Sequence, residues 1–309
     1  MKLAIVQKKP VFLDLGGSMK LIEETINDAA AKGTNLMVFG ETWLTGYPSW
    51  INFSPEIAAW GYEPMKELYA KMWGNGVEIP GKETEIICEY AKQHRMCIII
   101  GVNEIVRKGR GNGTIFNSAI TIDESGSIAV HHRKLMPTYT EKLLYGHGDG
   151  HGLKSIDTSF GRLGSLICWE HWMPHARQAM HLEGEDIHVA LWPSVHDIHQ
   201  LASRHYAFEG RCYVVAVGQM LYAGDLPKNL NIPKEYRNQP DKIVRNGGSC
   251  IFGPDGSTLL EPQFDKNEVI YFDLNDTKQV IKEHITLDVA GHYSRPDIFS
   301  FGIDRGRQD

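Results

Sequence analysis

Short apolar runs alternate with longer amphipathic stretches along this chain, and the alternation predicts strands connected by helices. The runs at 2–7 and 36–39 are typical of buried strands, because apolar side chains occupy most of their positions. Between them, residues 17–33 place apolar side chains along one face of a helix. Ser18 is predicted to cap this helix, and Gly33 is predicted to end it.

The same two patterns continue along the rest of the chain. Further strands are expected at 97–106, 115–122, 127–132, 161–168, 187–192, 213–217, 248–252, 257–261 and 269–274. Further helices are expected at 82–94, 174–183 and 198–210, and over the second part of the aromatic segment 42–69, from Pro55 onward. Residues 221–246 are polar, contain three prolines and are interpreted as an insertion.

Each half of the chain therefore combines strands, helices and one hairpin. This pattern predicts the α/β class, with two mixed sheets packed face to face and helices outside, a four-layer α-β-β-α sandwich. The alternative is a single doubly wound sheet, whose dinucleotide-binding members carry GxGxxG after the first strand. Here QKKP follows at 7–10, which favours the sandwich.

Composition indicates a globular protein with one large core. With 309 residues, 42% of them apolar, we expect a single domain over 1–309. Its core is expected at about 1–275, and its tail, at 276–309, is expected at an oligomer interface. The net charge of −6, without a basic stripe, argues against nucleic acid as a partner.

The sequence shows no pattern typical of membrane insertion or export. Lys8 and Lys9 interrupt the N-terminal apolar run, and no later run is long enough to cross a bilayer. The five cysteines are an odd number, widely separated and without paired spacing. A reduced cytoplasmic protein without membrane contact is therefore expected.

Three side chains that can carry chemistry close predicted buried strands. These are Glu41, Lys134 and Cys168. Each alone has an ordinary explanation, as a loop acid, a solvated lysine and a small buried side chain. Because a helix is expected soon after Cys168, nearby backbone N–H groups are expected to lower the pKa of its thiol and favour the thiolate.

Together these side chains supply a base, a cation and a soft nucleophile, because strand ends on one sheet edge tend to converge on one cleft. That set suits attack on a carbon bonded to nitrogen. The sulfur adds to the carbon, the ammonium stabilises the atom that gains negative charge, and the carboxylate moves protons. A serine triad would need a GxSxG turn, which is missing. The histidines at 196, 199 and 205 lack an accompanying HExxH or paired-cysteine motif, so no metal site is expected.

Three motifs of this chain resemble those of a known family. They are GETWLTGYP around Glu41, HHRKLMPTYTE around Lys134 and GRLGSLICWEHWMPHAR around Cys168. They are similar to the catalytic motifs of the nitrilase (carbon–nitrogen hydrolase) superfamily, and the resemblance extends to GHYSRPDIF at 291–299. The CWEH and RKLMPTYTE runs look like the nitrilase branch rather than the amidases or carbamoyl hydrolases.

The resemblance implies an α-β-β-α sandwich and assigns roles within it. Glu41 would be the general base, Lys134 the stabilising cation, Cys168 the nucleophile and Glu141 a second glutamate that positions lysine and substrate. It also implies a homodimer built through outer helices, which many nitrilases extend into higher oligomers such as spirals or filaments. This chain ends ten residues after Phe299, short of the extension that nitrilases often carry, which argues against long filaments.

The resulting expectation is a nitrilase that converts an organic nitrile into the carboxylic acid and ammonia, through a thioimidate and then a thioester on Cys168. No cofactor is expected, because neither the redox state nor the carbon skeleton changes. Three alternatives stay open: an amidase or other carbon–nitrogen hydrolase with the same side chains, cyanide hydrolysis, and a non-catalytic assembly or binding protein.

Aromatic and proline side chains beside the motifs are the candidates for substrate contact. They are Tyr47, Tyr145, Trp169, Trp192 and Pro193. They suggest an apolar or aromatic substituent beside the nitrile, although core packing explains each of them equally well. At Trp169 the backbone N–H is the expected catalytic group. Glu170 and His171 are expected either to orient this turn or to touch the substrate.

Overall fold

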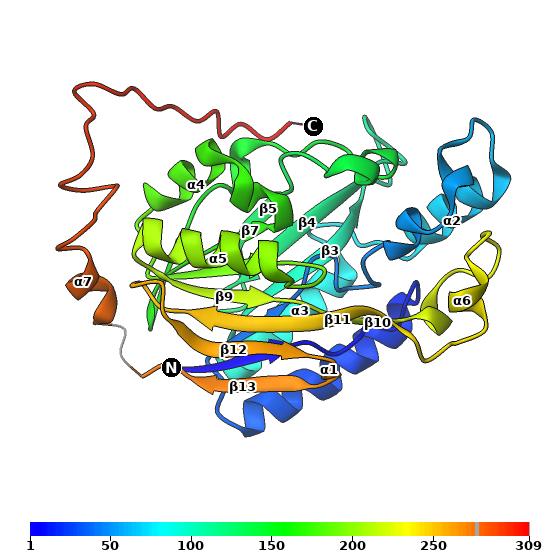
Figure 1. The fold of residues 1–309 in the computed structure, drawn as a ribbon, viewed down its shortest axis with the longest axis horizontal. Helices are drawn as coiled ribbons and strands as arrows, with labels where there is room; N and C mark the ends of the chain where they lie inside the picture. Colours follow the sequence, from blue (N-terminus) through cyan, green and yellow to red (C-terminus); the bar gives the residue numbers. More distant parts are fainter. Residues whose placement is uncertain (276–277, 309) are drawn as a thin grey trace.

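Two mixed β-sheets form the centre of the protein, in a computed structural model that describes residues 1–275 and 278–308 (Figure 1). The first sheet has the strand order β13-β1-β2-β3-β4-β5. Its strands are β1 (Lys2–Val6), β2 (Leu36–Phe39), β3 (Cys97–Ile105), β4 (Ile115–Ile122), β5 (Ile128–Arg133) and β13 (Val269–Asp273). Strands β1, β2 and β3 run parallel, and the other pairs are antiparallel.

The second sheet repeats this plan with the order β10-β11-β9-β8-β7-β6, and β12 pairs with β11. Its strands are β6 (Ile156–Thr158), β7 (Gly161–Ile167), β8 (Ile187–Leu191), β9 (Tyr213–Val217), β10 (Met220–Tyr222), β11 (Ile243–Phe252) and β12 (Thr258–Phe264). Its parallel centre is β7, β8 and β9. The parallel strands of each sheet therefore end on a common edge.

Side-chain alternation places the first sheet between two apolar layers. Along β1, Leu3 and Ile5 pack with side chains of the second sheet, whereas Ala4 and Val6 pack with helices α1 and α3. Helices α4 and α5 cover the outer face of the second sheet, on the side opposite α1 (Figure 1). The helices are α1 (Leu15–Ala31), α2 (Glu63–Gly74), α3 (Lys82–His94), α4 (Pro174–His181), α5 (Asp197–Gly210), α6 (Lys234–Arg237) and α7 (Gln279–Glu283). The predicted four-layer α-β-β-α sandwich is confirmed.

Helix α1 begins earlier than its sequence pattern predicts. Its N-cap is Asp14, whose carboxylate accepts a hydrogen bond of 2.9 Å from the N–H of Gly17. Ser18 is buried inside the helix, and its hydroxyl donates to the carbonyl of Val11 at 3.0 Å. The prediction of Ser18 as the cap is therefore wrong.

Two other segments also differ from the expectation. The helix expected from Pro55 is a short 3-10 turn (Pro55–Ala58) followed by α2, which begins at Glu63 with a proline in its first turn. The segment interpreted as an insertion, 221–246, belongs partly to the second sheet. Its ends pair in β10 and β11, with Leu221 opposite Arg245.

The last described residues return to the chain's own sandwich. Arg305 forms an ion pair of 2.6 Å with Glu183, and Arg307 lies 3.2 Å from Asp149. The N–H of Gln308 donates to the same Asp149 carboxylate at 3.0 Å. These contacts place the C-terminal end beside the loop that follows β5.

The limits of the expected tail, at 276–277 and 309, lie outside the described residues. No helix within 1–275 and 278–308 has both the length and the apolar character needed to cross a membrane.

Candidate active site

Four side chains from the three motifs meet where the two sheets pack against each other. Glu41 follows β2, Lys134 follows β5 and Cys168 follows β7, while Glu141 lies in a short 3-10 turn, Tyr139–Leu143. None of the four side chains belongs to a residue that is more than 4% exposed. The predicted convergence of these strand ends is confirmed by the distances between their side chains.

Lys134 lies between two carboxylates. Its Nζ donates to Glu41 Oε1 at 2.6 Å and to Glu141 Oε2 at 2.7 Å. Burial alone would lower the pKa of Lys134, but the charge that Cys168 carries once it is ionised and the carboxylates of Glu41 and Glu141 raise it well above its usual value. Lys134 is therefore a protonated, buried cation that two carboxylates hold in place.

Glu41 has one engaged oxygen and one free oxygen. Oε1 accepts from Lys134 and, at 2.7 Å, from Nδ2 of Asn117. Oε2 is buried and has no hydrogen-bond partner within the described part of the chain. Burial raises the pKa of Glu41 to about 7, against the opposing effect of Lys134. A carboxylate with a raised pKa and a free oxygen can accept a proton near neutral pH.

Cys168 lies beside both glutamates. Its Sγ and one carboxylate oxygen from each of Glu41 and Glu141 lie within 4.8 Å of one another. Burial raises the pKa of Cys168 well above its usual value, and the Glu41 carboxylate raises it further, although Lys134 opposes both. The expectation of a lowered thiol pKa is therefore wrong. The resting group is a thiol, and Glu41 is placed to take its proton.

The turn that carries Cys168 is fixed by the side chain of Glu170. Glu170 accepts from the N–H of Ile167 at 2.7 Å and from the N–H of Leu135 at 2.8 Å, and His132 Nε2 lies 2.9 Å away. Burial tends to raise the pKa of Glu170, but His132 and the two backbone N–H groups lower it, so the carboxylate stays charged. Glu170 thus connects the turn that carries Cys168 to Leu135, the residue after Lys134. Of its two expected roles, orienting this turn or touching the substrate, these contacts support the first.

Glu141 is held from three directions. Beside its bond to Lys134, Oε1 accepts from the hydroxyl of Tyr47 at 2.7 Å, and Oε2 accepts from the N–H of Thr138 at 2.9 Å. This arrangement fixes the negative charge of Glu141 next to the ammonium. It also places Tyr47, an expected substrate contact, directly beside Glu141 and Lys134.

The other expected substrate contacts lie in different surroundings. Tyr145 is buried, and its hydroxyl donates to Asn103 Oδ1 at 2.8 Å. Trp169 is 41% exposed, so its side chain lies at the surface beside the site. Trp192 is fully buried, and its indole N–H donates to Ser203 in α5 at 3.1 Å.

Pro193 is also buried, in the loop that follows β8. The structure thus brings Tyr47 into contact with Glu141 and directs the Trp192 indole N–H toward α5. The backbone carbonyl of Trp192, in contrast, accepts the N–H of Glu41 at 3.3 Å.

Two amide side chains that support the site were not expected from the sequence. Asn117 binds Glu41 Oε1, and Gln219 Nε2 donates to the backbone carbonyl of Glu41 at 2.6 Å. Both residues are at most 2% exposed. The signal for Asn117 is an amide inside a strand predicted to be buried, because buried amides need partners. The position of Gln219 between β9 and β10 is a comparable, weaker signal.

A glycine allows β3 to approach the turn that presents Glu41. A Cβ atom at Gly101 would lie 2.4 Å from the carbonyl oxygen of Gly40 and 2.4 Å from the N–H nitrogen of Thr42. Any side chain at this position would collide with the backbone of the turn and displace Glu41.

The carboxylates and the thiol are also the kinds of group that can bind a metal. Across 1–275 and 278–308, Glu41, Glu141 and Cys168 are the one group of three such side chains close enough to share an ion. Lys134 Nζ, however, lies within 2.7 Å of an oxygen from each glutamate, where a cation would bind. The ammonium therefore supplies the positive charge at this position.

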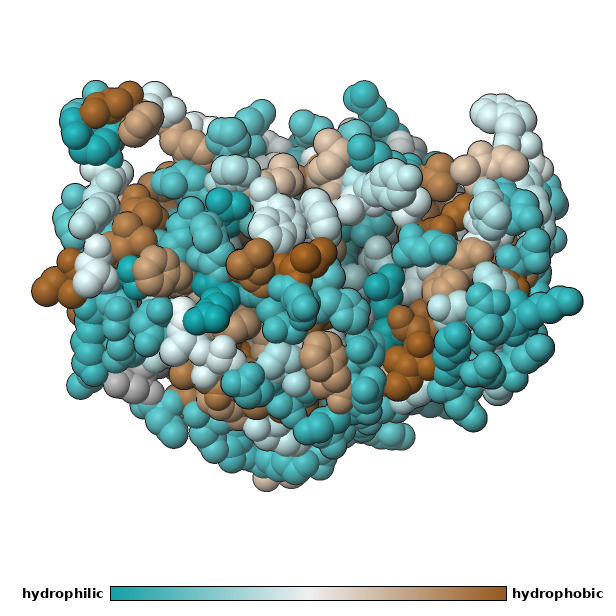
Figure 2. All heavy atoms as spheres, in the orientation of Figure 1, coloured by the Kyte–Doolittle hydropathy of each residue, from teal (hydrophilic) through white to brown (hydrophobic). Residues whose placement is uncertain are grey.

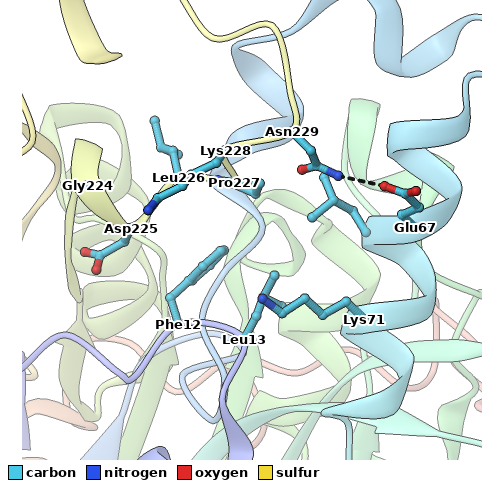
Figure 3. A pocket seen from close by; sticks show the side chains of 11 residues that line it. Phe12, Leu13, Glu67, Lys71, Gly224, Asp225, Leu226, Pro227, Lys228 and Asn229 are labelled. Carbon is cyan, nitrogen blue, oxygen red and sulfur yellow. Dashed lines mark hydrogen bonds between the residues drawn. The ribbon is translucent and has the colours of Figure 1, made fainter. Parts of the chain in front are cut away.

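A separate cavity lies between α2 and the segment 224–229 (Figure 3). Its volume is about 470 Å³, and Asn229 donates to Glu67 across it at 3.2 Å. None of its lining residues belongs to the cluster around Lys134. The cavity is therefore distinct from the candidate active site.

Comparison with known proteins relates this fold and this cluster to one family. The carbon-nitrogen hydrolase family matches residues 2–282. An aliphatic nitrilase of Sinorhizobium fredii is 35% identical, over 97% of this chain and 94% of its own length. A protein named nitrilase 2, from an unknown prokaryotic organism, is 35% identical over 99% of this chain and 93% of its own length.

A solved structure agrees with the fold. The crystal structure of a carbon-nitrogen hydrolase from Helicobacter pylori G27 superposes with a TM-score of 0.67 at 23% identity, covering 96% of each chain. At this level of identity the likeness concerns the fold, whereas the two relatives above match nearly the whole sequence.

Proposed function

The chain belongs to the carbon–nitrogen hydrolase family, in its nitrilase branch, and from this premise we propose that it hydrolyses an organic nitrile to the carboxylic acid and ammonia, with Cys168 as the nucleophile. It is thus an enzyme that acts on carbon–nitrogen bonds. The observation that carries the proposal is the arrangement around Lys134. One ammonium lies between two carboxylates, and the thiol of Cys168 lies within 4.8 Å of an oxygen of each.

The first step is addition of the thiol to the nitrile carbon. Cys168 transfers its proton to Glu41 as the sulfur–carbon bond forms, because the pKa of the thiol is raised and that of Glu41, at about 7, suits a base. The nitrile nitrogen gains negative charge and receives the proton, which gives a neutral thioimidate.

Two water molecules complete the reaction. Glu41 takes a proton from the first water, whose oxygen adds to the thioimidate carbon. The nitrogen receives both protons of this water, one of them from Glu41, and the carbon–nitrogen bond then breaks to release ammonia and leave a thioester. The second water attacks the thioester, breaks the carbon–sulfur bond and returns the proton to Cys168. One nitrile and two waters thus yield one acid and one ammonia, with no change of redox state.

Two donors stabilise the charge that develops on nitrogen and later on oxygen. One is the Lys134 ammonium, which Glu41 and Glu141 hold in place. The other is the backbone N–H of Trp169, which lies in the first turn after Cys168, where backbone N–H groups lack a partner within the helix.

An ammonia-release screen over aliphatic, aryl and arylaceto-nitriles tests the proposed function. We expect acid and ammonia in equal amounts from at least one nitrile, and slower turnover of the matching amide. Acid and amide products are measured separately by chromatography. Faster turnover of the amides would instead identify an amide hydrolase, and turnover of cyanide alone would identify a cyanide hydrolase.

The raised pKa of Glu41 predicts a loss of activity in acid. Glu41 must be ionised to accept the Cys168 proton, and it becomes protonated as the pH falls through about 7. We therefore expect kcat/KM to fall about tenfold per pH unit on the acid side of this value. A pH–rate profile from pH 5 to 9 measures this limb, and a profile that stays level down to pH 5 would contradict the role of Glu41.

The substrate side chain is expected to lie against aromatic surface. Tyr47 contacts Glu141 directly, and the half-exposed ring of Trp169 adjoins Cys168. We propose that these two side chains contact an apolar or aromatic substituent on the nitrile carbon. The aliphatic and arylaceto-nitriles in the screen distinguish between these two kinds of substituent.

We also propose that the protein acts in the cytoplasm as a homodimer, or a larger homo-oligomer, that pairs through its outer helices. Apolar side chains interrupt the polar surface over α5 (Figure 2). The exposed large apolar side chains here are Ile198, Leu201 and Phe208 on α5 and Leu182 directly after α4. The exposed tail side chains Phe299 and Phe301 would join the same interface.

All five cysteines are free thiols, which supports a reducing compartment.

A further inference from the structure

A chain of buried polar side chains leads from the backbone of Cys168 into the layer between the second sheet and α5. His171 Nδ1 lies 2.8 Å from the carbonyl oxygen of Cys168, and His171 Nε2 lies 3.0 Å from His188 Nε2. His188 Nδ1 lies 2.8 Å from Glu185 Oε1, and the hydroxyl of Tyr206 donates to Glu185 Oε2 at 2.5 Å. No member is more than 4% exposed. The chemistry proposed above uses none of these four side chains.

One arrangement of protons satisfies every bond in this chain. A carbonyl only accepts, so His171 Nδ1 carries a hydrogen. Burial and the neighbouring His188 lower the pKa of His171 to about 3, and burial holds the pKa of His188 well below its usual value. Both rings are therefore neutral, and His188 donates from Nε2 to His171 and accepts at Nδ1. Its donor is the protonated carboxyl of Glu185, whose pKa burial raises to about 8.

The fold makes room for these side chains. A Cβ atom at Gly164 of β7 would lie 1.7 Å from Glu185 Oε1, so only glycine fits beneath the carboxyl group. The rings of His188 and Tyr206 stack with their centroids 3.9 Å apart. Both contacts fix the far end of the chain, and the near end is the peptide bond between Cys168 and Trp169.

In that peptide bond, the carbonyl of Cys168 accepts from His171, and the N–H of Trp169 is the proposed donor to the substrate. A trans peptide is planar, so the N–H of Trp169 points away from the carbonyl of Cys168, and a bond that fixes the carbonyl also fixes the N–H. Cys168 has φ of +51°, a left-handed conformation that strains a residue with a side chain by roughly 1 kcal/mol or more. Rotation of this peptide would change ψ of Cys168 and leave its φ as it is, but it would turn the N–H of Trp169 away from the site.

We propose that His171, His188, Glu185 and Tyr206 lock the Cys168–Trp169 peptide so that the N–H of Trp169 faces the atom that gains negative charge. The inference rests on the proposed function, in which this N–H is a stabilising donor. None of the four side chains touches substrate, so all four are positioning residues. The sequence alone does not predict the link between Glu185 and the Cys168–Trp169 peptide, because the two are separated by sixteen residues.

Two reactions of the same thiol separate this role from general support of the fold. Turnover of a nitrile or amide develops charge on nitrogen or oxygen and needs the N–H of Trp169. Alkylation of Cys168 by iodoacetamide is displacement at a tetrahedral carbon, which needs the thiol and Glu41 but not that N–H. A change that only turns the peptide should slow the first reaction and leave the second nearly unchanged.

Glu185→Ala and Glu185→Gln form a matched pair of variants. Alanine leaves His188 Nδ1 without a donor, whereas the glutamine amide can donate to His188 and accept from Tyr206. We expect Glu185→Ala to lower kcat about 100-fold, with KM and the alkylation rate within about twofold of wild type. Glu185→Gln should retain kcat within about threefold, because it keeps both hydrogen bonds.

The measurements are kcat and KM on whichever nitrile or amide the wild type turns over, and alkylation at Cys168 followed by mass spectrometry. Should Glu185→Ala fail to fold, Tyr206→Phe removes the last donor and keeps the ring, and a roughly fivefold loss of kcat with normal alkylation is expected. Unchanged kcat in the folded variant, or a parallel loss of turnover and alkylation, would overturn the inference. Failure of the proposed function looks different, because then the wild type itself releases no ammonia from nitriles.

Discussion

Replacement of Cys168 by alanine is expected to lower kcat for the nitrile by at least about 10⁴-fold, because the sulfur that forms both covalent intermediates is then missing. Within the described residues, the other cysteines lie elsewhere: Cys97, Cys212 and Cys250 are fully buried in the core, and Cys88 is on α3. Ammonia release under saturating nitrile measures the loss. The assay must detect rates below about 10⁻⁴ of the wild-type rate.

The matched control is Cys88→Ala, which removes a partly buried thiol on the outer helix layer and should keep full activity. Alanine at Cys168 has the same backbone preference as cysteine, so circular dichroism and the melting temperature should stay close to those of wild type. Wild-type rates of ammonia release from Cys168→Ala would remove the thiol from the mechanism. Loss of activity in Cys88→Ala would indicate a general sensitivity to cysteine removal.

Glu41→Gln is expected to lower kcat by about 10³-fold and to abolish the acid limb of the pH profile. Glutamine keeps the geometry, because its carbonyl oxygen can accept from Lys134 and Asn117 in place of Oε1. It has no basic oxygen to take the Cys168 proton or to activate water. Stopped assays across pH 5 to 9 would show a low rate without the fall that begins near pH 7.

Glu141→Gln distinguishes the contribution of Glu41, the proposed base, from that of a neighbouring carboxylate charge. This variant also removes one carboxylate beside Lys134, but it leaves Glu41 present. Because the charge on Glu141 helps to raise the pKa of Glu41, the acid limb should move to lower pH in this variant. We expect a smaller loss of kcat, on the order of 10²-fold, with the acid limb retained. An acid limb that vanished in Glu141→Gln and persisted in Glu41→Gln would exchange the roles of the two glutamates.

The strand ends that carry the chemistry could be predicted from the sequence. Glu41 and Cys168 each follow a strand of mostly apolar residues, Lys134 follows a strand whose second half is polar, and strands that run in the same direction end on a common edge. The N-cap of α1 was harder to predict, because Asp14 and Ser18 both follow the first strand and both can accept a backbone hydrogen bond. Only the fold shows that Ser18 faces inward to Val11.

The pKa of Cys168 shows why local reasoning fails inside a core. The sequence places a helix after this residue, and a helix N-terminus lowers a thiol pKa. In the structure, burial and Glu41 outweigh that effect, and Glu41 belongs to the other sheet. Partners such as Asn117 and Gln219 are hidden for the same reason, since sheet packing determines which buried amide meets which carboxylate.

The proposed catalytic groups are divided between two sheets, so a measurement of activity would also report whether the two sheets remain packed together. Glu41 and Lys134 follow strands of the first sheet, and Cys168 follows a strand of the second, so neither sheet alone holds a working set. A slight separation of the sheets under denaturant or pressure would silence ammonia release while helices and strands persist. Two fragments divided in the loop before β6 would each be inert, and recovery of activity on mixing them would report their association directly.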